Sequence, residues 1–282
     1  MLELLDSLLV QRALLAAVII GFTNGFVSAF VVLHRSPLKL GALSHAILPG
    51  IAVVVLLAGI STIGIYAGAL AAAALVGLGA VFLARRSALG EDTVLAVLFT
   101  GAFALGVFLI TNFEGGDALE HWLLGNIIGL SDSDLWMSFA VGSLAVAVVT
   151  LFRRPIMLNL FEADVAATLG VRTALLNYGL FALLILVLVT TLQAVGTVLA
   201  IGLIVTPAAI VRQLTHSVRG LFLWSGVVGA FGAVLGFSLA FPFDQPQGAS
   251  MVLTLSTMFL VAVGIRRLRE RRASHAHVHG AA

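Results

Sequence analysis

The sequence has no cysteine and few charged residues. Without cysteine, the chain can form neither a disulfide nor a thiolate metal site. Only 10% of its 282 residues are charged, against about 25% in a soluble domain, whereas 61% are hydrophobic and the mean hydropathy is +1.15. This shortage of charge excludes an ordinary soluble domain.

Common nucleotide-binding and catalytic motifs are also missing. The sequence contains no GxxxxGK[ST] phosphate-binding loop, no HExxH motif and no Ser/His/Asp arrangement that suggests chemistry on a substrate. We therefore expect no enzyme activity and no nucleotide-binding site in this chain. A membrane pore or a scaffold fits these absences better.

The chain contains a series of apolar runs of about 20 residues, the length that crosses roughly 30 Å of hydrocarbon. The pattern predicts an all-α, polytopic helical membrane protein with eight or nine transmembrane helices, in a single membrane domain over residues 1–268. The predicted segments are 8–33, 41–60, 62–84, 92–112, 134–152, 173–194, 196–213, 219–241 and 249–265.

Basic residues orient these segments. All of them except Arg12 fall on alternate loops, whereas the loops near 61, 113–121, 195 and 242–248 have none. The positive-inside rule places the basic loops in the cytoplasm. Nine segments then give an external N-terminus and a cytoplasmic C-terminus, and the count falls to eight if the first segment does not span.

Two stretches lie outside this pattern. Residues 117–131 are apolar but too short to cross, which predicts a re-entrant or interfacial helix. Residues 269–282 form a basic tail that we expect to be disordered. Its histidines, His275, His277 and His279, could bind metal weakly, but an idle polar tail is the favoured interpretation.

His45 is the only histidine well inside an apolar segment. Ionisable groups in a span are costly and usually face the protein interior or a water-filled cavity. Pro49, four residues later, has no N–H, so it frees the carbonyl of His45 and bends the helix. Imidazole, this carbonyl and the Ser44 hydroxyl could together form a transient site for a divalent cation. A histidine hydrogen-bonded across a helix kink is the alternative.

Thr206-Pro207 places a second proline inside an apolar segment, the seventh, and predicts either a hinge or a kink that only shapes packing.

Residues 153–172 form a long cytoplasmic loop. Glu162 to Leu169 predicts a short amphipathic helix there, with Glu162 and Asp164 in its first turn and Gly170 at its end. The acidic start argues against a helix lying on the membrane surface.

Several of these stretches, in order, resemble the permease subunits of the ATP-binding-cassette importers for zinc, manganese and iron. The clearest is "SHAILPG" at 44–50, similar to the family signature SHAxLPG. Others are "NGFVSAFVVLHR" at 24–35, "EDTVLAVLFTGAFALGV" at 91–107, "LLGNIIGLSDSDL" at 123–135 and "LQAVGTVLAIGLIVTPAAIVRQLT" at 192–215. The family usually has GDxLSH before the histidine, but here Gly41 stands in place of the aspartate.

The resemblance implies a type II-like importer transmembrane domain in the bacterial cytoplasmic membrane, moving a divalent metal inward with zinc or manganese as the expected cargo. It implies a second permease chain, a separate ATPase and an external solute-binding protein as partners. "FEADVAATLGV" resembles the helix that docks on the ATPase, which gives Glu162, Asp164 and Gly170 a coupling role. Because Gly41 stands where the family has aspartate, a non-metal cargo remains an alternative. An ATP-independent channel or secondary transporter is a further alternative, but intramembrane acids that could serve as its proton or sodium relays are almost absent.

Overall fold

The computed structural model describes residues 8–34, 37–59, 61–113, 125–215, 217–243 and 245–279, and its regular elements in these ranges are all helices. Helices α2 to α6 are α2 (Leu8–Leu33), α3 (Pro37–Ala46), α4 (Leu48–Ala58), α5 (Thr62–Ala84) and α6 (Glu91–Phe113). The second half contains α8 (Asp132–Leu151), α9 (Arg153–Phe161), α10 (Ala163–Thr168), α11 (Thr173–Val195), α12 (Thr197–Leu214), α13 (Val218–Ala240), the 3-10 turn η1 (Phe241–Phe243) and α14 (Gln247–His279).

Eight of the described helical segments are long and apolar enough to cross a membrane, which confirms a polytopic helical membrane protein. The first segment is one of them, with a helix of 26 residues. The shorter apolar helix is instead Leu199–Leu214, in α12. The sequence had suggested that the N-terminal segment decides between eight and nine spans. In the structure the short helix is α12, so the choice depends on whether α12 crosses the membrane.

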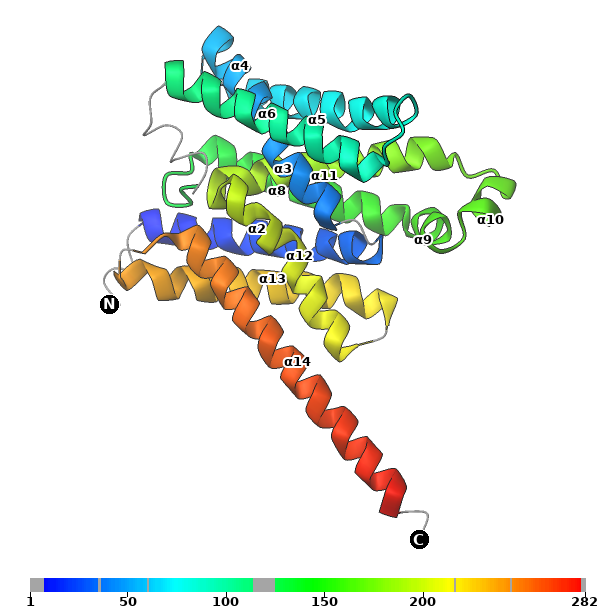
Figure 1. The fold of residues 1–282 in the computed structure, drawn as a ribbon. Coiled ribbons are helices and arrows are strands. Elements are labelled where there is room, and N and C mark those ends of the chain that lie inside the picture. The colour runs from blue at the N-terminus through cyan, green and yellow to red at the C-terminus, as the bar shows by residue number, and fades with distance from the viewer. Residues whose placement is uncertain are drawn as a thin grey trace.

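The helices form two groups that meet along α3 and α11. One group contains α4, α5 and α6, side by side at one edge of the bundle, and the other contains α2, α12, α13 and α14 (Figure 1). The α5–α6 loop, the α9–α10 segment and the α12–α13 turn lie at the same end of the bundle (Figure 1). These are the segments that carry basic residues, so the fold brings the predicted cytoplasmic loops together.

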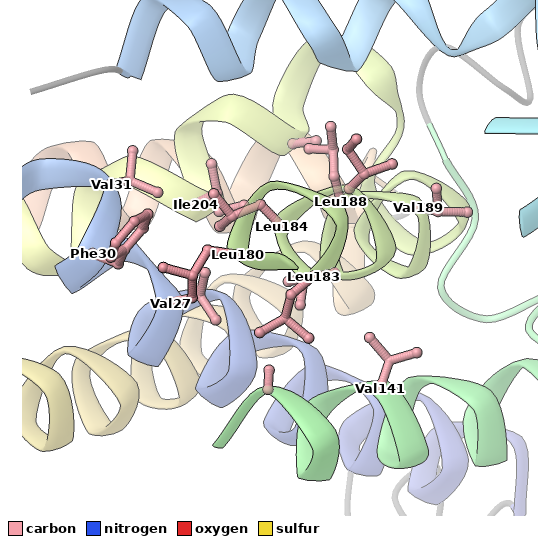
Figure 2. Packing of buried hydrophobic residues seen from close by; sticks show 14 of the residues in the cluster. Val27, Phe30, Val31, Val141, Leu180, Leu183, Leu184, Leu188, Val189 and Ile204 are labelled. Carbon is pink, nitrogen blue, oxygen red and sulfur yellow. The ribbon is translucent and has the colours of Figure 1, made fainter. Parts of the chain in front are cut away.

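α11 lies in the middle of the core. Its residues Ile185, Val187, Leu188 and Val189 are all fully buried, so the second half of this helix is covered on every side, whereas Leu175 and Tyr178 in its first half are exposed. Figure 2 shows its leucines among Val27, Phe30 and Val31 of α2 and Ile204 of α12, with Val141 of α8 nearby. A helical segment that is apolar all round is buried on all sides, so the second half of α11 forms the centre of the core.

Helices α2 and α13 approach each other closely. A Cβ atom added at Gly25 would lie 2.1 Å from the carbonyl oxygen of Ser225, and one added at Gly21 would lie 2.6 Å from that of Gly229. Gly21 and Gly25 are four residues apart, so both lie on the α2 face that meets α13. Membrane helices pack by such small residues because lipid supplies no hydrophobic driving force between them.

Two sequence expectations meet the structure only in part. Of the helix predicted at 117–131, residues 117–124 lie outside the described residues, and 125–131 form a turn. Gly125 there has a φ of 72°, and the Asn126 side chain accepts a hydrogen bond from the Gly129 N–H at 2.9 Å. This local bond closes a turn where a helix was expected.

α14 continues to His279, into the segment for which we expected disorder, although side chains beyond Glu270 are outside the described part.

Candidate translocation site

The second apolar segment is broken in its middle. α3 ends at Ala46 and α4 begins at Leu48, with Ile47 as a turn between them. Pro49 lies in the first turn of α4, where its missing N–H would have had no partner within the helix. The break is packed from outside by α6, because a Cβ at Gly106 would lie 2.9 Å from the Pro49 nitrogen. The structure thus has a break between two helices at the position where the sequence predicts a bend.

The imidazole of His45 lies just before this break and is half-buried. Its ring packs edge-on against Phe103 of α6, with centroids 5.1 Å apart, and nearly parallel to Phe99, at 6.4 Å. Its Nδ1 atom is buried and has no hydrogen-bond partner among the described residues. Leaving such an atom unpaired costs about 1–3 kcal/mol. The alternative of a histidine held by a hydrogen bond across the kink is thus not supported at Nδ1, and that atom is available to a ligand.

Ser44 is placed differently from the sequence expectation. It is fully buried, and its Oγ donates a 2.7 Å hydrogen bond to the carbonyl of Gly41, one turn earlier in the same helix. The hydroxyl is therefore occupied within α3 and does not lie on an open surface beside the imidazole.

Gly41 stands at the position where the family that this sequence resembles has aspartate. The space beside it is filled by a side chain of α12. A Cβ atom at Gly41 would lie 1.9 Å from Cδ1 of Ile201 and 3.0 Å from its Cγ1. The side chain of Ile201 therefore occupies the volume into which a residue at 41 would extend. His45 packs against α6, and the Gly41 position packs against α12. Because residue 41 is glycine, α3 provides an imidazole at this site but no carboxylate.

This packing predicts the effect of restoring the acid. We expect Gly41→Asp to lower the yield of folded protein, because it displaces Ile201 and buries a charge inside the membrane at a cost of about 2.5–3.5 kcal/mol. Gly41→Asn introduces the same bulk without the charge. Thermal unfolding of both variants with and without Mn²⁺ separates the two effects: Mn²⁺ should raise the midpoint of the aspartate variant and not that of the asparagine variant. Equal responses would show that position 41 does not reach the metal path.

The second proline, Pro207, lies inside α12. The amide of the next residue, Ala208, donates a 2.9 Å hydrogen bond to the Ser28 hydroxyl of α2, which in turn donates to the Gly25 carbonyl at 2.8 Å. These bonds tie α12 to α2 directly beside the proline. Thr206 is half-buried and enters no such bond that the structure describes.

One turn earlier in α2, a second buried bond reaches α11. The Thr191 hydroxyl donates to the Asn24 side-chain oxygen at 2.9 Å, while the Asn24 amide nitrogen donates to the Ile20 carbonyl at 2.8 Å. Asn24 and Ser28 together hold α2 to two other helices. Sequence reasoning did not single out either residue. Two polar residues, one helical turn apart in a hydrophobic span, were the available signal.

The predicted coupling segment is an exposed helix with a well-defined end. α10 is preceded by Glu162, which is exposed like Asp164 of its first turn. Gly170 has a φ of 79°, its N–H donates to the Ala167 carbonyl at 3.1 Å, and the Val171 N–H donates to Ala166 at 3.0 Å. This pair of bonds is the Schellman motif, which requires a left-handed residue.

Metal-binding groups elsewhere in the chain are sparse. The described residues contain no group of three or more His, Asp or Glu side chains that could hold a metal ion. The side chains of His275, His277 and His279 lie outside the described part of the structure, so their suggested role stays a prediction.

The sequence and fold resemble known membrane transport proteins over nearly the whole chain. The family model of the ABC 3 transport family matches residues 6–266. The manganese import system permease protein ScaB of Streptococcus parasanguinis is 34% identical over 97% of this chain and 98% of the relative. A probable iron transport system membrane protein of Haemophilus influenzae is 31% identical over 96% and 98%.

A solved structure, PsaBC from Streptococcus pneumoniae in complex with Fab, superposes with a TM-score of 0.86 at 30% identity, covering 92% of each chain. A structure of an inward-facing putative metal-chelate type ABC transporter shares the fold, with a TM-score of 0.70 at 18% identity. Because the family model matches residues 6–266 and a relative is 34% identical over 97% of this chain, the chain belongs to the ABC 3 transport family.

Proposed function

We propose that this chain is the permease subunit of an ATP-binding-cassette importer, with a divalent metal ion as cargo and His45 on its path. The observation that carries the proposal is the buried, unpartnered Nδ1 of His45 at the break between α3 and α4. Imidazole nitrogen binds first-row divalent metals, and a single ligand from each chain suits a site that must release its ion. The relatives named above are described as manganese and iron transport proteins, so we propose manganese or iron ahead of zinc.

The proposed assembly has two permease chains, a separate ATPase on each and an external binding protein that delivers the metal. The basic segments gathered at one end of the bundle support a cytoplasmic location for that end in a bacterial cytoplasmic membrane, with the C-terminus inside (Figure 1). α10 lies at this end and presents Val165 and Leu169, both exposed, beside the acidic Asp164. This surface is the one we propose for docking the ATPase.

The docking role makes a prediction at Gly170. A Cβ there meets nothing within 4 Å, so Gly170→Ala changes only the backbone preference at a φ of 79°. The left-handed conformation costs a non-glycine residue roughly 1 kcal/mol, which should unwind the end of α10 and weaken ATPase binding about fivefold. Gly90→Ala, in the α5–α6 loop with nothing within 4 Å of its Cβ, is the matched control. Equal ATPase affinity of the two variants, measured by biolayer interferometry, would remove α10 from the docking surface.

Transport itself tests the function. The chain is reconstituted with its ATPase and binding protein in proteoliposomes, and uptake of radiolabelled manganese, iron and zinc is measured with and without ATP. We expect ATP-dependent uptake of manganese or iron. Uptake that persists without the ATPase would establish the channel or secondary-transporter alternative. Failure of all three metals to enter an ATP-hydrolysing complex would overturn the metal cargo and favour a non-metal one.

A further inference from the structure

A large cavity opens between α2, α8, α9 and α13, away from His45. Its volume is about 710 Å³. It is lined by Phe26, Val149, Thr150, Arg153, Arg154, Met157, Leu158, Phe161, Glu162, Val218, Phe222 and Leu223. The cavity shares Glu162 with the predicted coupling segment, but it is lined neither by His45 nor by Val165 and Leu169 of the proposed docking surface.

The cavity has a charged mouth and an apolar interior. Arg153 and Arg154 begin α9, directly after the span that ends at Leu151. Val149 lies within that span, and Phe26 lies about 10 Å before the end of α2 at the helical rise of 1.5 Å per residue. The cavity therefore extends from the level where lipid head groups lie to the level of the acyl chains.

The charges in the lining favour an anion at the mouth. The two arginines are exposed and form no ion pair with another residue that the structure describes, and Glu162 is the only acid in the lining. The charged side chains of the lining therefore sum to one net positive charge. Guanidinium groups present planar donor pairs that match phosphate oxygens, and basic pockets between transmembrane helices at the membrane surface bind anionic head groups.

We propose that this cavity binds an anionic phospholipid, with its phosphate group between Arg153 and Arg154 and an acyl chain along Met157, Phe222 and Phe26. The contacts join α9 to α2 and α13, so a bound lipid would fix the start of the 153–172 loop against the bundle. The proposal depends on the membrane-spanning fold and is independent of which ion is transported.

The test compares lipid retention by the purified full-length chain. Nanodiscs of phosphatidylcholine, with or without phosphatidylglycerol, supply the lipid, and native mass spectrometry counts the molecules that remain bound after extraction. Arg153→Gln with Arg154→Gln should weaken phosphatidylglycerol retention about 30-fold, at the usual contribution of each basic residue near a membrane. Arg85→Gln with Arg86→Gln is the control, because this adjacent pair lies in a loop at the same end and lines no cavity described here.

A second variant keeps both arginines and fills the cavity. Thr150 donates its hydroxyl to Val146 within α8 and faces the cavity, whereas Thr257 makes the same kind of bond, to Leu253 in α14, on an exposed face. Thr150→Trp should reduce phosphatidylglycerol retention and Thr257→Trp should not. The proposal is overturned if both arginine pairs lose lipid equally, if phosphatidylcholine is retained as well as phosphatidylglycerol, or if inorganic phosphate alone displaces the bound molecule.

Discussion

Replacing Gly25 with alanine is expected to destabilise the folded protein. The added methyl group would lie 2.1 Å from the Ser225 carbonyl oxygen and 3.0 Å from the Gly226 Cα, and both are backbone atoms of α13. No side-chain rotation can relieve that contact, so α2 and α13 must separate. Overpacking of this kind costs about 1–3 kcal/mol, more than the roughly 1 kcal/mol by which alanine favours a helix over glycine.

The separation would also disturb the buried bonds of α2. The Gly25 carbonyl accepts the Ser28 hydroxyl, whose oxygen accepts the Ala208 amide beside Pro207. We expect a lower midpoint of thermal unfolding and a loss of monodisperse protein by fluorescence-detected size-exclusion chromatography. Gly101→Ala and Gly179→Ala are matched controls, since both glycines are in spans and their Cβ atoms would meet nothing within 4 Å. These controls should be neutral or slightly more stable, and a Gly25 variant that behaves like them would contradict the packing.

Replacing His45 with alanine should abolish metal uptake while leaving the protein folded. Mutation of residues that merely support a metal ligand typically lowers affinity 10–100-fold, so loss of the ligand itself should reduce uptake at least about tenfold. The Nδ1 atom of His45 has no hydrogen bond to lose among the described residues, so the variant should be present at wild-type abundance. A histidine with a purely structural role would show the opposite result, with lower stability and normal uptake per folded molecule.

His34→Ala is the control for this variant. His34 lies directly after α2, at the predicted cytoplasmic end, and its ring stacks on Phe30 with centroids 5.5 Å apart. It therefore resembles His45 in having an aromatic neighbour but lies outside the broken segment. Uptake should be normal in the His34 variant, measured as initial rates of radiolabelled manganese or iron entry. Equal rates in both variants would remove His45 from the path.

Much of the fold follows from apolar run lengths alone. Eight of the nine predicted segments coincide with described helices to within about four residues, the second of them as α3 and α4, whereas α14 continues 14 residues beyond the predicted end at 265. Pro49 marks the break near His45, because a missing N–H acts locally. Of the re-entrant or interfacial helix predicted at 117–131, the described residues 125–131 are not helical, since a hydrogen bond to the Asn126 side chain closes a turn there, and the rest stays a prediction.

The candidate site could be predicted less completely, because its contacts join distant positions. Thr191 and Asn24 are separated by 167 residues, and the packing of Ile201 against Gly41 and of Phe103 against His45 also crosses between helices. A single sequence shows which residues are unusual for a membrane span. It does not show which of them meet, so the histidine was identified and its neighbours were not.

The turn at Ile47 has a mechanical consequence. α3 contacts both helix groups, including α12, whereas the main contacts of α4 are with α5 and α6, so the chain changes partners at this residue. α3 is a lever about 15 Å long at 1.5 Å per residue, and a 10° rotation about Ile47 would sweep its Pro37 end through about 2.5 Å. The helix axis at His45, roughly 3 Å from the pivot, would move only about 0.5 Å. The backbone that carries the imidazole would thus shift much less than the Pro37 end of the same helix.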